Sequence, residues 1–168
     1  MPFVYNKIHF MPDFKNTKYK NIEEIDQKDI LIKKESIEDL KESIKISWAN
    51  PRITDFDYPL NDSLLGKWEV QVLRTDKKMK FEDIFILCKQ DGYEPATVYH
   101  LLNFIREVKN LSKYKSLMAP GSLCIDDFEY TGCVVFSNSG ATDLKLGLGN
   151  WRGSKIGEYD ILRVKKQI

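Results

Sequence analysis

The chain has 168 residues, of which 42% are hydrophobic and 30% charged, and this balance excludes general disorder and allows one packed core. Lysine and arginine together number 26 against 25 acidic residues, so the net charge is +1 and provides no overall field that would recruit nucleic acid or an anionic membrane. No apolar run approaches the roughly 20 residues that span a bilayer. We therefore expect a soluble single domain over residues 1–168, with no membrane contact and little tendency to bind nucleic acid.

The three cysteines, Cys88, Cys124 and Cys133, are far apart in the sequence. Their spacing fits neither a disulfide framework nor a zinc site, and residues 1–10 contain no apolar core followed by a small-residue cleavage site. We expect reduced thiols in a cytoplasm, either of a bacterium or of a host cell reached by a phage or parasite. No motif predicts a metal or a cofactor.

The first 66 residues are predicted to form a variable N-terminal part. Residues 3–10 and 30–33 are rich in strand-forming side chains, and the polar stretch of residues 13–29 separates them. Residues 51–66 combine Pro, Gly and Asp with several apolar side chains. We expect a long loop that lies on the core, because so many apolar groups are not left in solvent.

A helix is predicted to begin after Ser36. Asp39 follows three residues later, which is the spacing of a capping box, and apolar residues then recur at helical spacing as far as Trp48. Asn50-Pro51 predicts the end of this helix, because proline disfavours helical geometry in the residue before it.

The remainder, residues 67–168, is predicted to hold a strand, a pair of helices and a β-meander. Apolar and polar side chains alternate from Trp68 to Arg74, as in a half-buried strand. Helical periodicity predicts one helix over residues 77–90 and another capped by Thr97. Short β-prone runs separated by turn residues then predict the meander. The predicted fold class is α+β, with two to three helices packed on a mostly antiparallel sheet.

A glycine-rich segment, residues 147–155, carries the strongest signal for a contact surface. Glycines let the backbone approach a ligand, while Asn150, Trp151, Arg152 and Lys155 supply an amide, an aromatic ring and positive charge. The order of these residues is not that of a phosphate-binding Walker loop. The segment is either a plain loop between strands or a surface that contacts a ligand or partner.

Three residues could form a catalytic site. His100, on the predicted third helix, is the natural proton-transfer group near neutral pH. Cys124 and Asp126 lie in the predicted meander, which could fold against that helix and give a Cys–His or Asp–His pair. In the alternative interpretation, His100 is a structural helix residue, Cys124 is a buried thiol, and Asp126 belongs to a solvated turn.

Residues 92–104, in which Gly-Tyr precedes a helix that starts with Pro-Ala-Thr, resemble a pattern in small uncharacterised bacterial proteins. In that pattern a Gly-Ser strand and a meander follow and close on an Arg-Val-Lys terminus, matched here by residues 120–122, 144–146 and 161–166. The resemblance covers residues 80–166. The same order is also similar to the later half of C-type-lectin-like domains in bacterial proteins, which implies a lectin-like fold. Neither resemblance implies a functional residue.

For function, the sequence favours a non-enzymatic binding or protein-interaction module of unknown ligand, whose contact surface includes the glycine-rich segment. One alternative is a small hydrolase or transferase that uses His100 with Cys124 or Asp126. Another is a phage or parasite effector that binds a host protein. The expected partner is a protein or a small ligand, and the sequence predicts no oligomeric state.

Overall fold

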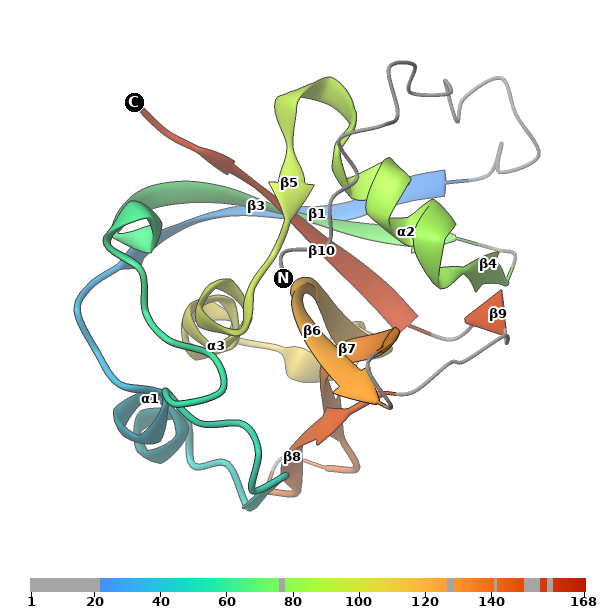
Figure 1. The fold of residues 1–168 in the computed structure, drawn as a ribbon. Helices are drawn as coiled ribbons and strands as arrows, with labels where there is room; N and C mark the ends of the chain where they lie inside the picture. The colour runs from blue at the N-terminus through green and yellow to red at the C-terminus, as the bar shows by residue number, and fades with distance from the viewer. Residues whose placement is uncertain (1–21, 76–77, 127–128, 141, 150–154, 157–158) are drawn as a thin grey trace.

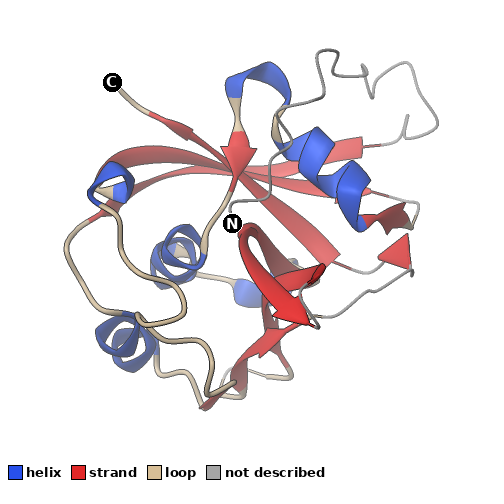
Figure 2. Ribbon diagram, in the orientation of Figure 1, coloured by secondary structure: helices blue, strands red, loops and turns tan. Residues whose placement is uncertain are grey.

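The described part of the chain folds into three α-helices packed on a mixed, open β-sheet (Figure 1, Figure 2). The computed structural model describes residues 22–75, 78–126, 129–140, 142–149, 155–156 and 159–168. This arrangement is the α+β class that the sequence predicts. The strand expected over residues 3–10 lies outside the described residues.

Helices and strands are interspersed along the chain. The strands are β1 (Ile22–Ile32), β2 (Trp48–Ala49), β3 (Gly66–Thr75), β4 (Met79–Lys80), β5 (Glu94–Pro95), β6 (Ser116–Asp126), β7 (Glu129–Asn138), β8 (Leu144–Leu148), β9 (Lys155–Ile156) and β10 (Tyr159–Lys166). The helices are α1 (Ile37–Ile44), α2 (Phe81–Cys88) and α3 (Val98–Glu107), with short 3-10 turns at Asp62–Leu64, Gln90–Gly92 and Leu111–Lys113. Among the described residues, no helix has the length and apolar character needed to cross a membrane.

Strand β10 lies inside the main sheet, whose order is β1-β3-β10-β6-β7-β8-β2, with β5 also paired to β10. Strands β6, β7 and β8 form an antiparallel meander, as the sequence predicts. Strand β10 does not continue this meander but inserts between β3, to which it is antiparallel, and β6, to which it is parallel. Strands β4 and β9 pair separately.

One edge of β10 has two successive neighbours. Its first residues pair with β6 and later ones pair with β5. Between these two pairings β6 turns away through a bulge over residues 120–122, where its register with β7 shifts. Gly121 donates its N–H to the carbonyl of Ala96 at 2.7 Å, and a Cβ at this position would lie 2.6 Å from the Pro95 carbonyl oxygen. Glycine is therefore required where β6 crosses β5.

The sheet separates two apolar clusters. On one face, Trp68, Val70 and Val72 of β3 pack with α1 and α3 in the larger cluster, which confirms the predicted alternation of this strand. On the other face, α2 packs against β3, β6, β7 and β10 in the smaller cluster. The buried Arg163 of β10 donates an Nη–H to the carbonyl of Leu87 at 3.3 Å, which ties the end of α2 to the sheet.

Helix α1 is shorter than the sequence predicts. Ser36 accepts the Asp39 N–H at 3.0 Å, as the capping spacing requires, but Lys45 takes a left-handed conformation (φ 66°) and ends the helix. Trp48, expected on the helical stripe, instead lies in β2 and is 51% exposed. Its neighbour Ser47 donates its N–H to a β8 carbonyl at 2.8 Å. Pairing with a distant strand therefore overrides the local helical periodicity.

Two other boundaries differ from the sequence prediction. Strand β1 begins at Ile22, within the stretch of residues 13–29 expected to be a polar connection, and pairs with β3 along its length. The predicted helix pair is present as α2 and α3. Helix α2 begins at Phe81, later than the predicted residue 77, because Met79 and Lys80 pair with β9.

Replacing Gly121 with Ala is expected to lower the free energy of unfolding by about 1–3 kcal/mol, because the added Cβ overlaps the Pro95 and Ala96 carbonyl oxygens. Gly147→Ala is the matched control, since a Cβ there meets Val135 at an ordinary 3.8 Å. Urea denaturation followed by circular dichroism measures both variants. Equal stability of the two would contradict the steric role assigned to Gly121.

Candidate functional site

The glycine-rich contact segment predicted from the sequence is largely outside the described residues. Asn150, Trp151 and Arg152 all fall there. Lys155 is placed in β9, where its backbone pairs with Lys80 of β4. The hypothesis that these four residues form a contact surface therefore stays a prediction.

The predicted catalytic residues are placed as follows. His100 lies in α3 and is fully buried, with its ring centre 4.4 Å from that of Trp68 in an edge-to-face contact. Cys124 is buried in β6, and its thiol donates to the carbonyl of Gly149 at 3.2 Å. Asp126 is the last residue of β6. A proton relay between His100 and either residue stays a prediction.

The His100 ring has a different partner in the structure. Its Nδ1 accepts the backbone N–H of Thr97 at 3.0 Å, so the neutral ring carries its proton on Nε2. Nε2 is buried without a hydrogen-bond partner. Burial lowers the pKa of His100 from 6.5 to about 3. The ring is therefore neutral at pH 7, with its Nδ1 lone pair already in use at the start of α3.

An exposed aromatic residue that sequence reasoning missed stands out in the connection between β2 and β3. Phe56 is 93% exposed, whereas Ile53, three residues earlier, is completely buried. The sequence prediction that the apolar residues of this loop lie on the core is right for Ile53 and for Tyr58, Leu64 and Leu65, which pack against the larger cluster. It is wrong for Phe56.

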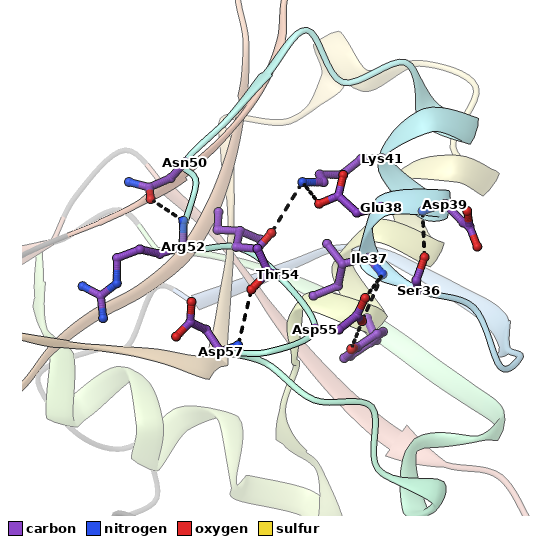
Figure 3. Close-up of polar contacts among 12 residues, drawn as sticks. Ser36, Ile37, Glu38, Asp39, Lys41, Asn50, Arg52, Thr54, Asp55 and Asp57 are labelled. Atoms are coloured by element: carbon purple, nitrogen blue, oxygen red, sulfur yellow. Dashed lines mark hydrogen bonds and ion pairs between the residues drawn. The ribbon is translucent and has the colours of Figure 1, made fainter.

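The residue before Phe56 is fixed by two helices. Both carboxylate oxygens of Asp55 accept the backbone N–H of Ile37, at 3.1 and 3.2 Å, in the first turn of α1 (Figure 3). The phenol of Tyr99 in α3 lies 2.7 Å from Asp55 Oδ1 and 2.6 Å from the carbonyl of Tyr58. One carboxylate therefore joins the loop to α1 and α3 directly on the N-terminal side of Phe56.

The residues after Phe56 are held as well. Tyr58 donates its N–H to the carbonyl of Thr54 at 2.9 Å, and Asp57 donates its N–H to the Thr54 hydroxyl at 3.4 Å (Figure 3). The phenol of Tyr58 donates to the carbonyl of Leu123 in β6 at 3.1 Å. Burial raises the pKa of Tyr58 to about 12, so this phenol remains a donor at neutral pH. The turn of residues 54–58, which we call the Phe56 turn, is thus attached on both sides of its exposed ring.

The arrangement of the Phe56 turn suits binding better than catalysis. A large apolar ring projects into solvent from a backbone whose position is already fixed. The exposed Arg52 and Asp57, four residues before it and one after it in the chain, carry opposite charges. Aromatic anchors with a polar surround are common at protein interfaces. Within the described part of the chain, no group of three or more His, Cys, Asp or Glu side chains could hold a metal ion.

A pocket of about 500 Å³ lies between the residues that follow α3 and the β7–β8 turn. Its polar groups are engaged locally: Asn110 Oδ1 accepts the N–H of Ser112, and Ser139 donates its hydroxyl to Asp143. Tyr114, also in its lining, donates its phenol to a carboxylate of β1. These side chains of the lining are therefore already paired within the protein.

Two substitutions should distinguish the contribution of the exposed Phe56 ring to stability from that of Tyr99, which holds the turn. Tyr99→Phe is expected to lower the free energy of unfolding by about 1–2 kcal/mol, because two half-buried acceptors lose the phenol that they share. Phe56→Ala is expected to change it by less than about 0.5 kcal/mol, because the ring makes little contact with the fold. Thermal and urea unfolding measure both. A Phe56→Ala variant as destabilised as Tyr99→Phe would show that the ring packs on the protein.

No protein-family model matches the chain, and neither a curated protein nor a solved structure matches it. The resemblances to small bacterial proteins and to C-type-lectin-like domains stay predictions.

Proposed function

We propose that the chain is a non-enzymatic protein-interaction module that contacts its partner through the Phe56 turn. The observation that carries this proposal is the 93% exposure of Phe56 on a turn fixed on both sides by hydrogen bonds. An exposed phenylalanine contributes little to folding, and burying it in a partner's pocket would gain about 1.5–3 kcal/mol.

The hydrogen bonds around Phe56 support binding in a second way. Ordering a flexible loop on association costs free energy that is subtracted from affinity. Here the loop is already ordered when the chain folds, because Asp55 and Tyr58 are attached to α1, α3 and β6. The turn is therefore preorganised, and its conformation need not change when a partner covers the ring.

The glycine-rich segment remains part of the proposal as a second contact, on sequence grounds alone. A protein partner is favoured over a small ligand, because a projecting side chain inserts into a partner's surface whereas small ligands occupy concave sites. An effector that binds a host protein would use the same surface. The effector hypothesis differs from the interaction-module hypothesis only in the organism that supplies the partner.

Site-specific photo-crosslinking tests the Phe56 contact. Placing the photoreactive analogue p-benzoylphenylalanine at position 56 is expected to give a discrete protein adduct in cells of the native source. The same analogue at position 168 is the matched control, since Ile168 is also an exposed apolar residue but lies at the end of the chain. Phe56→Ala should then weaken binding of the identified partner at least tenfold, which corresponds to about 1.4 kcal/mol. Adducts that are absent at position 56, or equally strong at position 168, would refute the contact.

The contact predicted for the glycine-rich segment has its own test. Replacing Trp151 and Arg152 together with Ala is expected to abolish capture of the partner that co-purifies with the wild-type chain. Lys109→Ala, at an exposed position in the connection that follows α3, serves as the control for loss of surface charge. Unchanged capture by a folded double variant would contradict a role for this segment.

A further inference from the structure

The start of α3 is the point where three parts of the fold meet. Three consecutive backbone N–H groups are each satisfied by a different element: Ala96 donates to the carbonyl of Leu162 in β10 at 3.2 Å, Thr97 donates to His100 Nδ1 at 3.0 Å, and Val98 donates to the hydroxyl of Ser122 in β6 at 2.7 Å. Helix N-termini leave N–H groups that need such acceptors. The middle acceptor of the three is a titratable ring.

We propose that His100 is an acid-sensitive latch: its neutral ring holds the N-terminal end of α3 against the sheet, and protonation of that ring releases it. A proton added at Nδ1 occupies the lone pair that accepts the Thr97 N–H. The same event places a positive charge in a fully buried position. Both effects oppose the folded state, and this inference does not depend on the proposed protein-binding function.

The surroundings of His100 offer the charged ring no carboxylate; the polar side chain against Nδ1 is the uncharged Thr97 hydroxyl, at 2.9 Å. The aromatic neighbour of His100 is Trp68, and the ammonium of Lys166 on β10 lies 5.4 Å from the centre of that indole. On β1, Lys28 lies on the same strand face as Ile30, which faces α3. The β6 residue at this end of α3 is the uncharged Ser122.

Two carboxylates near α3 already pair with basic side chains other than His100. Glu35, before α1, pairs with Arg106 in the last turn of α3. Asp26 of β1 pairs with Lys113. On β5, burial raises the pKa of Glu94, which disfavours its charged form. The depressed pKa of His100 is attributed to burial alone, with no carboxylate counteracting it.

The direction of the pH effect follows from this depressed pKa. The unfolded chain takes up a proton near pH 6.5, whereas the folded chain resists protonation until about pH 3. The contribution of neutral His100 to stability is therefore complete above pH 6.5 and is lost as the pH falls from 6.5 toward 3. Within that window, one proton bound on unfolding raises the unfolding equilibrium constant about tenfold for each pH unit.

His100→Gln tests the latch, because glutamine at this position of a capping box can accept the Thr97 N–H but cannot be protonated. We expect the ratio of wild-type to variant unfolding constants to rise about tenfold per pH unit below pH 6, measured by urea titrations between pH 4 and 8. The carboxylates titrate in both proteins, so their effects cancel in this ratio. Parallel profiles for wild type and His100→Gln would overturn the proposal.

A measurement on the wild-type chain covers the case in which His100→Gln does not fold. Nitrogen-15 NMR of histidine-labelled protein should show His100 as a neutral ring protonated on Nε2 at pH 5, where an ordinary histidine is mostly charged. Titration of His100 near pH 6.5 in the folded protein, or a ring protonated on Nδ1, would equally overturn the proposal.

Discussion

The crossing of β6 over β5 determines how the rest of the molecule is arranged. Strand β10 pairs first with β6 and then with β5 on the same edge, so β6 must turn away from β10 between these two pairings while it stays paired with β7. Gly121 permits the close approach, and the following Ser122 accepts the first N–H of α3. The bulge that moves β6 away therefore also fixes where α3 starts, and α3 in turn packs against α1, β1 and β6.

Elements with strong local signals were predictable from the sequence. Helix α3 has an N-cap residue, Thr97, and a clear apolar stripe, and β3 alternates from Trp68 onward. The elements that sequence reasoning misplaced depend on distant partners. Trp48 keeps the helical spacing of α1 but pairs with β8, and β10 leaves the meander to pair with β3. The charged edge strand β1 lacks a full apolar pattern because much of its surface is exposed.

The candidate site was harder to predict for the same reason. Hydrophobicity alone makes Ile53 and Phe56 look alike, yet one is buried and the other exposed. The difference arises because Asp55 bonds to Ile37 and Tyr99, residues 18 and 44 positions away. The run Asp55-Phe56-Asp57, an aromatic residue between two carboxylates, was the available local signal. Asp57 is exposed as that pattern suggests, but the Asp55 carboxylate is half-buried and hydrogen-bonded, so the pattern alone does not predict which side chain faces solvent.

Helix α3 links the two proposals physically. Tyr99 and His100 are consecutive residues in its first turn: the phenol of Tyr99 holds the Phe56 turn through Asp55 and Tyr58, and the imidazole of His100 holds the helix start through Thr97. Loss of that first turn would remove the donor that both acceptors share. The rigidity that makes Phe56 suitable as an anchor therefore depends on the same helical turn whose integrity requires a neutral histidine. Protonation of His100 would therefore also loosen the attachment of the Phe56 turn, through the helical turn that Tyr99 and His100 share.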